Sequence, residues 1–225
     1  MAAWAAPSRG RHHGLATIDW TSPDALLRSV DGWLLPKPQR EALTDAYQSP
    51  PRAYHHFGHV LEVLRHYHAV AAGPGWQQPR EIQLAVLYHD AIYQPGRSDN
   101  ERRSADLAAR ELADLPGVDL TRVRELIELT ARHGSLRRED VDADAAHFLD
   151  CDMAILGADA ASFDHYDAAI AEEYRGVVPG FVFRFKRRRF LQGLLERPRI
   201  YLSDYGHTRW DAQARINLRR ATGKG

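Results

Sequence analysis

The stretch Leu84-Ala85-Val86-Leu87-Tyr88-His89-Asp90-Ala91-Ile92 places an adjacent histidine and aspartate near the end of an apolar run. If this run is helical, its spacing predicts a core-facing stripe that consists of Ile82, Ala85, Val86, His89, Ile92 and Tyr93. Asp90 is rotated from this stripe by one residue. An ionised carboxylate so close to a core costs several kcal/mol to desolvate, so it needs a cation, a partner charge or hydrogen-bond donors. A metal ion is one such cation. A buried His-Asp hydrogen bond that only locks the helix is the alternative, and the dipeptide alone does not decide between them.

The whole chain has the composition of an ordinary globular domain. It has 225 residues, of which 44% are hydrophobic and 27% charged, and this length is enough for one large domain with its own core. Lys plus Arg and Asp plus Glu both number 30, so the net charge is zero and nothing in it favours nucleic acid or a membrane as partner. We therefore expect a small partner molecule.

Cysteine content and hydropathy predict a cytoplasmic protein. Cys151 is the only cysteine, which excludes an intramolecular disulfide framework and fits a reducing compartment. No stretch approaches the ~18 uncharged apolar residues of a membrane span. Residues 1–15 are too rich in Arg and His for a secretory signal.

Residue periodicity predicts an all-α protein. We interpret residues 1–17 as a loose tail and residues 18–225 as one helical domain. Helices are predicted to open at Ser22, Pro79 and Ser98. Another is predicted to include His55 and His59, and further ones to cover 37–47, 120 to about 133, 140–156, 162–174, 179–195 and 210–218. Strand-like alternation, internal repeats and a glycine-rich phosphate loop are absent from the sequence.

Two further inward-facing candidates join His89 and Asp90. His59 falls at the edge of a buried helix face, one turn after His55, and Asp152 falls in the middle of an apolar face formed by Phe148, Leu149, Ile155 and Leu156. Because helical residues turn by about 100° each, Asp150 points about 200° away from Asp152, so only one of them can face the same point. We expect it to be Asp152, and a structural or supporting role for Asp150. A mixed nitrogen and oxygen set suits one divalent ion such as Mn, Fe, Co, Ni, Zn or Mg, and it comprises His59, His89, Asp90 and Asp152.

This order of ligands, His, then His-Asp, then Asp, resembles the HD superfamily of metal-dependent phosphohydrolases. More closely, a set of strings from Arg52 to Leu218 is similar to a bacterial group described as predicted HD-domain metal-dependent hydrolases: Arg52-x-Tyr54-His55-x-x-x-His59, Tyr88-His89-Asp90-Ala91-Ile92-Tyr93, Asp99-Asn100-Glu101, Thr130-x-x-His133, Phe148-Leu149-Asp150-x-Asp152-x-Ala154-Ile155-Leu156-Gly157 and Arg215-x-Asn217-Leu218. His56 stands where that group would have Asn, and Cys151 where it commonly has Ala. The resemblance implies an HD-type helical bundle, with a metal-site core at about 52–157 and C-terminal helices at 158–220.

The resemblance also implies hydrolysis of a phosphate ester of a small metabolite or nucleotide by metal-activated water. Arg52, His55 and His133 are the donors that we expect to reach a phosphate at the rim of the site. Glu101 is expected to serve in acid-base chemistry or to support the site. Structural hydrogen bonds would equally explain these four residues, and Ser98 to Glu101 has the form of a helix capping box.

Other interpretations stay open from the sequence. A metal- and nucleotide-binding sensor module without turnover would carry the same ligands. An alarmone pyrophosphohydrolase is less favoured, because Tyr93-Gln94 stands where such enzymes carry an acidic pair after the HD dipeptide. The basic run from Arg184 to Phe190 is interpreted as a solvated helix face rather than a nucleic-acid site. Cys151, between two acids, is a poor nucleophile.

Overall fold

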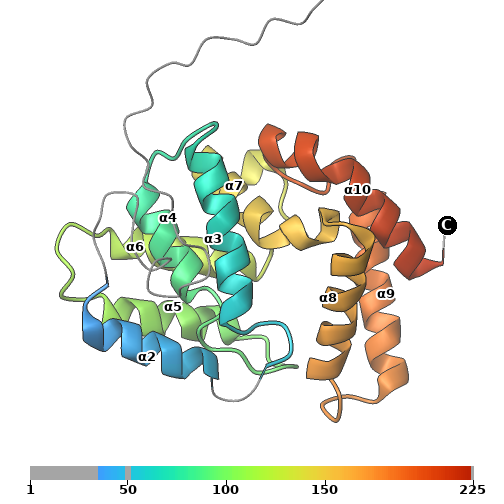
Figure 1. Ribbon diagram of the computed structural model, residues 1–225, viewed down its shortest axis with the longest axis horizontal. Helices are drawn as coiled ribbons and strands as arrows, with labels where there is room; N and C mark the ends of the chain where they lie inside the picture. The colour runs from blue at the N-terminus through green and yellow to red at the C-terminus, as the bar shows by residue number, and fades with distance from the viewer. Residues whose placement is uncertain (1–34, 49–51, 224–225) are drawn as a thin grey trace, which may run out of the picture. The chain divides into compact units, whose positions relative to one another are not determined.

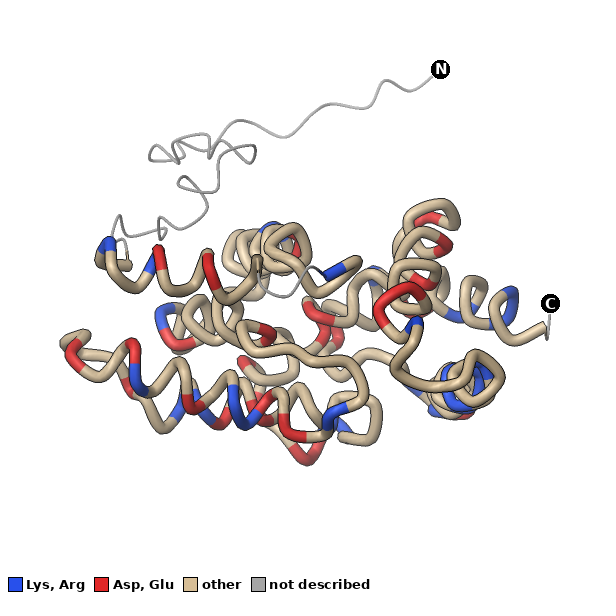
Figure 2. Tube along the Cα trace, turned by 90° about the horizontal axis from the view of Figure 1, so that it is seen from below, with Lys and Arg blue, Asp and Glu red and all other residues tan. Residues whose placement is uncertain are grey.

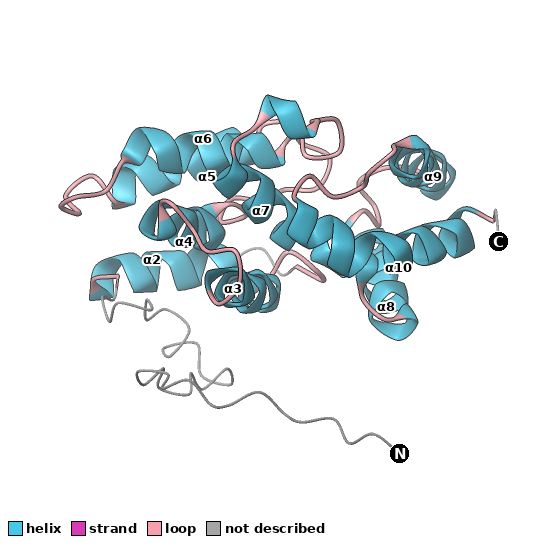
Figure 3. Cartoon of the chain, turned by 90° about the horizontal axis from the view of Figure 1, so that it is seen from above, coloured by secondary structure: helices cyan, strands magenta, loops and turns pink. Residues whose placement is uncertain are grey.

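The protein is all-helical in the part that its structure, a computed structural model, describes: residues 35–48 and 52–223 (Figures 1 and 3). These described residues cluster as one compact unit. The predicted tail at 1–17 and the predicted helix at Ser22 lie outside the described residues. The elements are α2 (Lys37–Gln48), α3 (Phe57–Ala71), α4 (Pro79–Tyr88), α5 (Asn100–Glu111), α6 (Leu120–Thr130), the 3₁₀ helix η1 (Arg138–Asp140), α7 (Ala143–Asp152), the 3₁₀ helix η2 (Met153–Gly157), α8 (Ala160–Glu173), α9 (Gly180–Glu196) and α10 (Asp204–Thr222). None of the helices in these ranges is long and apolar enough to cross a membrane.

α4 is the central helix of the N-terminal half. It packs against α3, α5, α6 and α7, and every residue from Glu81 to Tyr88 is buried. A helix that is apolar on all sides needs neighbours all round, which is why the run at 84–88 organises this half of the fold. Pro79 opens α4 as predicted.

Several predicted boundaries are wrong, and each has a local reason. α4 ends at Tyr88, so His89 is its C-cap and Asp90 lies in the following turn rather than on the helix. The predicted capping box does not form: Asp99 is the N-cap of α5, and its carboxylate binds the Arg97 guanidinium instead of the helix amides. The predicted helix at 140–156 is interrupted, because the chain tightens into η2 after Asp152.

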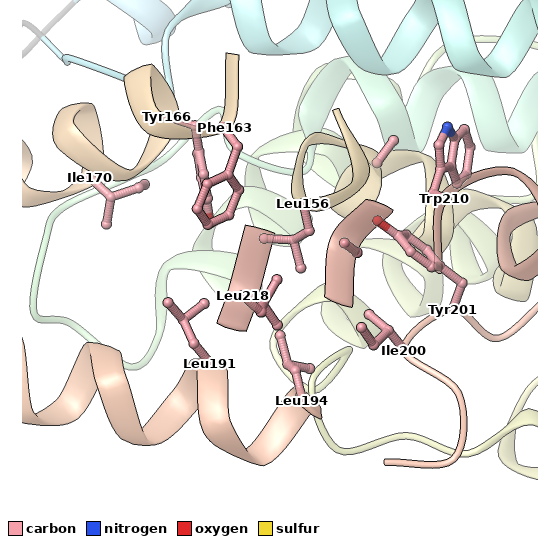
Figure 4. Close-up of a cluster of buried hydrophobic side chains, with 12 residues drawn as sticks. Leu156, Phe163, Tyr166, Ile170, Leu191, Leu194, Ile200, Tyr201, Trp210 and Leu218 are labelled. Atoms are coloured by element: carbon pink, nitrogen blue, oxygen red, sulfur yellow. The ribbon is translucent and has the colours of Figure 1, made fainter. Parts of the chain in front are cut away.

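The C-terminal helices α8, α9 and α10, on the right of Figure 1, share an apolar cluster with η2. Its largest members are shown in Figure 4: Leu156, Phe163, Tyr166, Ile170, Leu191, Leu194, Ile200, Tyr201, Trp210 and Leu218. α10 approaches η2 so closely that a Cβ on Gly157 would collide with Trp210. The Asn217 amide, fully buried on α10, donates to the carbonyls of Leu156 and Ala158. These contacts fix the chain directly after Asp152.

Candidate metal centre

Helix ends meet at the candidate site. His59 lies in the first turn of α3, His89 caps the C-terminus of α4, Asp90 follows it, and Asp152 is the last residue of α7. His56 caps α3 with its ring Nδ1, which accepts from the amide of Gly58. Backbone geometry at these ends, rather than one helix face, brings the four predicted ligands together.

Three of the four residues, His59, His89 and Asp90, have donor atoms that all lie within 4.8 Å of one another, and Asp152 contacts both histidines. His59 Nε2 lies 3.2 Å from His89 Nε2 and 3.0 Å from Asp152 Oδ1. Asp90 Oδ2 lies 3.2 Å from His89 Nε2 and 3.6 Å from His59 Nε2. Bonds of about 2.0–2.2 Å to one ion place neighbouring donors about 3.0–3.5 Å apart, so this spacing fits a single divalent ion.

The hydrogen bond of His89 to the backbone fixes the tautomer of its neutral ring. Nδ1 lies 2.8 Å from the carbonyl oxygen of Val86, which can only accept, so Nδ1 must carry a proton. In the neutral ring, Nε2 is then the nitrogen with the lone pair, and it faces His59 and Asp152. A ligand histidine held through its other nitrogen by a backbone carbonyl is a common arrangement in metal sites.

Charge compensation within the cluster is strong. Burial opposes ionisation of Asp90 and Asp152, but the neighbouring imidazoles outweigh it and hold the pKa of both carboxyls well below the usual range. Burial likewise disfavours a charged His89, but the two carboxylates outweigh it and raise the pKa of the ring well above its usual value. Two carboxylates and two imidazoles form a donor set that a dication would leave neutral.

Arg52 positions the turn after α4 and does not reach the pocket. Its Nη1 donates to the carbonyls of His55 and Asp90, at 2.9 and 2.6 Å, and its Nη2 donates to those of Ala46 and Ala91, at 2.8 and 2.9 Å. A guanidinium committed to four carbonyls has no terminal N–H group left for a phosphate. The phosphate contact predicted for Arg52 therefore has no geometric support, and we assign it the role of holding Asp90 in place.

His133 and Glu101 do lie at the site. The turn after α6 places His133 Nδ1 3.1 Å from Asp152 Oδ2, although off the line that a hydrogen bond requires. Glu101, in the first turn of α5, lines the same pocket. Both residues are available to a ligand or to water held near Asp152.

His55 pairs with a residue that sequence reasoning missed. It precedes α3, contrary to the predicted helical spacing, and its Nδ1 lies 2.6 Å from Glu173 Oε2. The other oxygen of Glu173, Oε1, accepts from the amides of Tyr54 and His55. These bonds outweigh the effect of burial and lower the pKa of Glu173. The His55 ring stacks on Tyr93 at 3.9 Å, so it is held on two sides.

Asp150 faces away from the site, as its helical phase predicts. Its Oδ1 accepts from the Leu202 amide at 2.6 Å, and its Oδ2 accepts from the Ser203 amide at 2.7 Å and the Ser203 hydroxyl at 2.6 Å. A Cβ on Gly206 would collide with this carboxylate, so α10 can start here only with glycine at that position. Burial raises the pKa of Asp150 to about 6 against these hydrogen bonds. Asp150 therefore ties α7 to the start of α10.

A pocket of about 250 Å³ is lined by three of the four candidate ligands, His59, Asp90 and Asp152. Histidines and carboxylates form one part of it, namely His55, His59, His133, Asp90, Asp152 and Glu101. Tyrosines from three segments form the walls: Tyr54 before α3, Tyr93 after α4, and Tyr166 and Tyr174 on α8 and at its C-terminal end. Arg97 and Arg187 add two guanidinium groups, and Arg187 comes from the run that was predicted to be a solvated face. The pocket thus combines a metal-type donor set with aromatic and cationic surfaces.

Comparison of the chain with protein-family models, with curated proteins and with solved structures gives no match in any of the three.

Substitution of the two aspartates of α7 is expected to have opposite effects on metal binding. Asp152→Asn is expected to abolish saturable Mn²⁺ binding in a calorimetric titration, because it removes one of two anionic donors. Asp150→Asn is expected to retain Mn²⁺ binding but to lower the free energy of unfolding by about 1–3 kcal/mol, because its amide would point an N–H at a backbone donor. Retained binding in Asp152→Asn together with lost binding in a folded Asp150→Asn would refute the assignment.

Proposed function

We propose that this protein is a metal-dependent phosphohydrolase of the HD superfamily that cleaves a phosphate ester of a small metabolite or nucleotide. The observation that carries the proposal is a set of four donor atoms, two imidazole nitrogens and two carboxylate oxygens. Each oxygen lies 3.0 to 3.6 Å from both nitrogens, and the two nitrogens lie 3.2 Å apart. The ligand order in the sequence and this spacing are independent of each other, and both favour one divalent ion at the same residues.

Pocket size and charge favour a small phosphorylated substrate. A volume of about 250 Å³ is below the range usual for drug-sized ligands, about 300–1,000 Å³. Four tyrosines offer ring surfaces for the organic part, while guanidinium and imidazole groups offer donors for a phosphoryl group. These features support the substrate class rather than a particular substrate.

His59, His89, Asp90 and Asp152 would hold the ion. A divalent ion there would supply Lewis-acid chemistry, polarising a phosphoryl oxygen and making water a stronger nucleophile near neutral pH. Arg52 fixes the carbonyls of Asp90 and Ala91, and thereby the direction of the Asp90 carboxylate. Glu101 and His133 lie where they can orient the attacking water or accept its proton.

The His55–Glu173 pair is suited to protonate the leaving group. Glu173 accepts from His55 Nδ1 and fixes the ring, so Nε2 is the nitrogen left to serve a ligand in the pocket. A histidine oriented in this way by a carboxylate is a typical general acid or base. In this proposal, a proton moves from His55 Nε2 to the departing alkoxide oxygen.

Phosphate release by the purified protein tests the proposed function. With Mn²⁺, Co²⁺ or Ni²⁺ supplied, we expect release of inorganic phosphate from at least one class among nucleoside monophosphates, sugar phosphates and p-nitrophenyl phosphate. Chelation should abolish it. Asp90→Asn should lower it at least about a hundredfold, since Lewis-acid stabilisation is worth several kcal/mol.

Three outcomes would contradict the proposal. Equal release by Asp90→Asn would assign the activity to a contaminant or another site. Full activity in the presence of a chelator would exclude the metal mechanism. Saturable nucleotide binding with no release from any class would favour the sensor module.

Glu173→Gln separates a role in proton transfer from a role in folding. Loss of the carboxylate should lower kcat/KM about 10- to 100-fold for an alkyl phosphate, whose leaving group needs a proton. It should change kcat/KM little for p-nitrophenyl phosphate, whose leaving group does not. Glu172→Gln is the matched control, because Glu172 is half-exposed and pairs with Arg175. Equal losses on both substrates would reduce Glu173 to a structural contact.

A further inference from the structure

Helix α9 carries a run of closely spaced cationic residues, seen as blue segments of its tube in Figure 2. They are Arg184, Lys186, Arg187, Arg188 and Arg189. Four of these side chains are exposed, as a solvated helix face predicts. Arg187 is the exception, since only 13% of its side chain is exposed. The prediction of a solvent-exposed side chain is therefore wrong for Arg187.

Arg187 is held in the wall of the pocket. Its Nε donates to Asp167 Oδ1 of α8 at 2.9 Å. Its guanidinium carbon lies 4.9 Å from the centre of the Tyr166 ring and 5.8 Å from that of Phe190. Contacts of this kind stabilise a guanidinium and hold its plane in one orientation.

One terminal nitrogen of Arg187 makes no hydrogen bond of good geometry, although the guanidinium also interacts with the Tyr166 hydroxyl. Nη2 is buried and has no hydrogen-bond acceptor among residues 35–48 and 52–223. A buried charged N–H group without an acceptor loses its hydrogen bonds to water and gains none in exchange, so it destabilises the folded protein. A fold that keeps such a group at the wall of a pocket is suited to an anionic ligand that supplies the acceptor.

The other guanidiniums near the site are already committed. Arg52 donates to four backbone carbonyls. Arg97 makes a bidentate contact with Asp99, at 2.6 and 2.7 Å, and is half-exposed. Arg52 Nε also lacks an acceptor, but Arg52 does not line this pocket. Of Arg97 and Arg187, the two arginines that line it, Arg187 is the one that combines burial with an unsatisfied donor.

Charge balance then points to the class of anion. A dication on two carboxylates would leave the metal centre without net charge, so a phosphate monoester dianion would need its countercharge from the protein. Arg187 carries a permanent positive charge that Asp167, whose side chain is 36% exposed, offsets only in part. A dianion would gain more from that charge than a monoanion would.

We propose that Arg187 binds the non-bridging phosphoryl oxygens of a phosphate monoester above the candidate metal centre. The inference rests on the proposed function for the identity of the anion. It replaces Arg52 by Arg187 as the phosphate-binding arginine, and it makes α9 part of the substrate site.

Binding of inorganic phosphate to the Mn²⁺-loaded protein tests this without any turnover. Arg187→Gln is expected to weaken phosphate binding about 10- to 100-fold in calorimetric titrations, while Mn²⁺ affinity stays unchanged. Arg184→Gln, one turn earlier on α9 and exposed, is the matched control and should bind phosphate as the wild type does. Dimethyl phosphate, a monoanion, should bind more weakly than inorganic phosphate to the wild type and should lose less affinity in Arg187→Gln.

Arg187→Lys serves as the second variant if Arg187→Gln fails to fold, because it keeps the charge but loses the planar fork. We expect its phosphate affinity to fall severalfold. Wild-type phosphate affinity in the folded variant would overturn the proposal, even if the protein hydrolyses phosphate esters. Conversely, weakened phosphate binding in a protein that hydrolyses nothing would retain the Arg187 subsite and reject the enzyme.

Discussion

The site depends on keeping two mostly buried carboxylates, Asp90 and Asp152, ionised in the wall of the pocket. Asp90 and Asp152 both lie against the imidazoles of His59 and His89, and these contacts outweigh the cost of burial. Removing a single member would leave uncompensated charge, which costs several kcal/mol in a protein interior. This requirement explains why the ends of α3, α4 and α7 meet at one point. Packing alone would not bring three polar helix ends together.

Contacts between residues that are distant in sequence hold these helix ends in place. Arg52 ties the turn after α4 to the segment before α3 through four carbonyls. Asp150 ties α7 to the start of α10, and Asn217 ties η2 to the same helix. Glu173 joins α8 to His55. The C-terminal helices therefore act on the site from two directions, by fixing Asp152 and by forming one wall of the pocket.

Local patterns predicted part of this and could not predict the rest. Helical periodicity gave the all-α class and the opposite phases of Asp150 and Asp152, because both depend only on residues within a few turns. The end of α4 at Tyr88 and the partners of Arg52, Glu173 and Arg187 depend on tertiary contacts. A charged residue in a basic run gives no sign in the sequence that it will be buried. That the four clustered donors bind an ion, as the order of residues indicated, stays a prediction.

The central claim is that these four donors bind one divalent ion, and anomalous diffraction from crystals grown with Mn²⁺ tests it most directly. The account predicts a single anomalous peak at bonding distance from His59 Nε2, His89 Nε2, an Asp90 oxygen and an Asp152 oxygen. Crystals of Asp152→Asn should show no peak there. The absence of a peak among these atoms in crystals grown with saturating Mn²⁺, or Mn²⁺ bound only elsewhere, would contradict this claim.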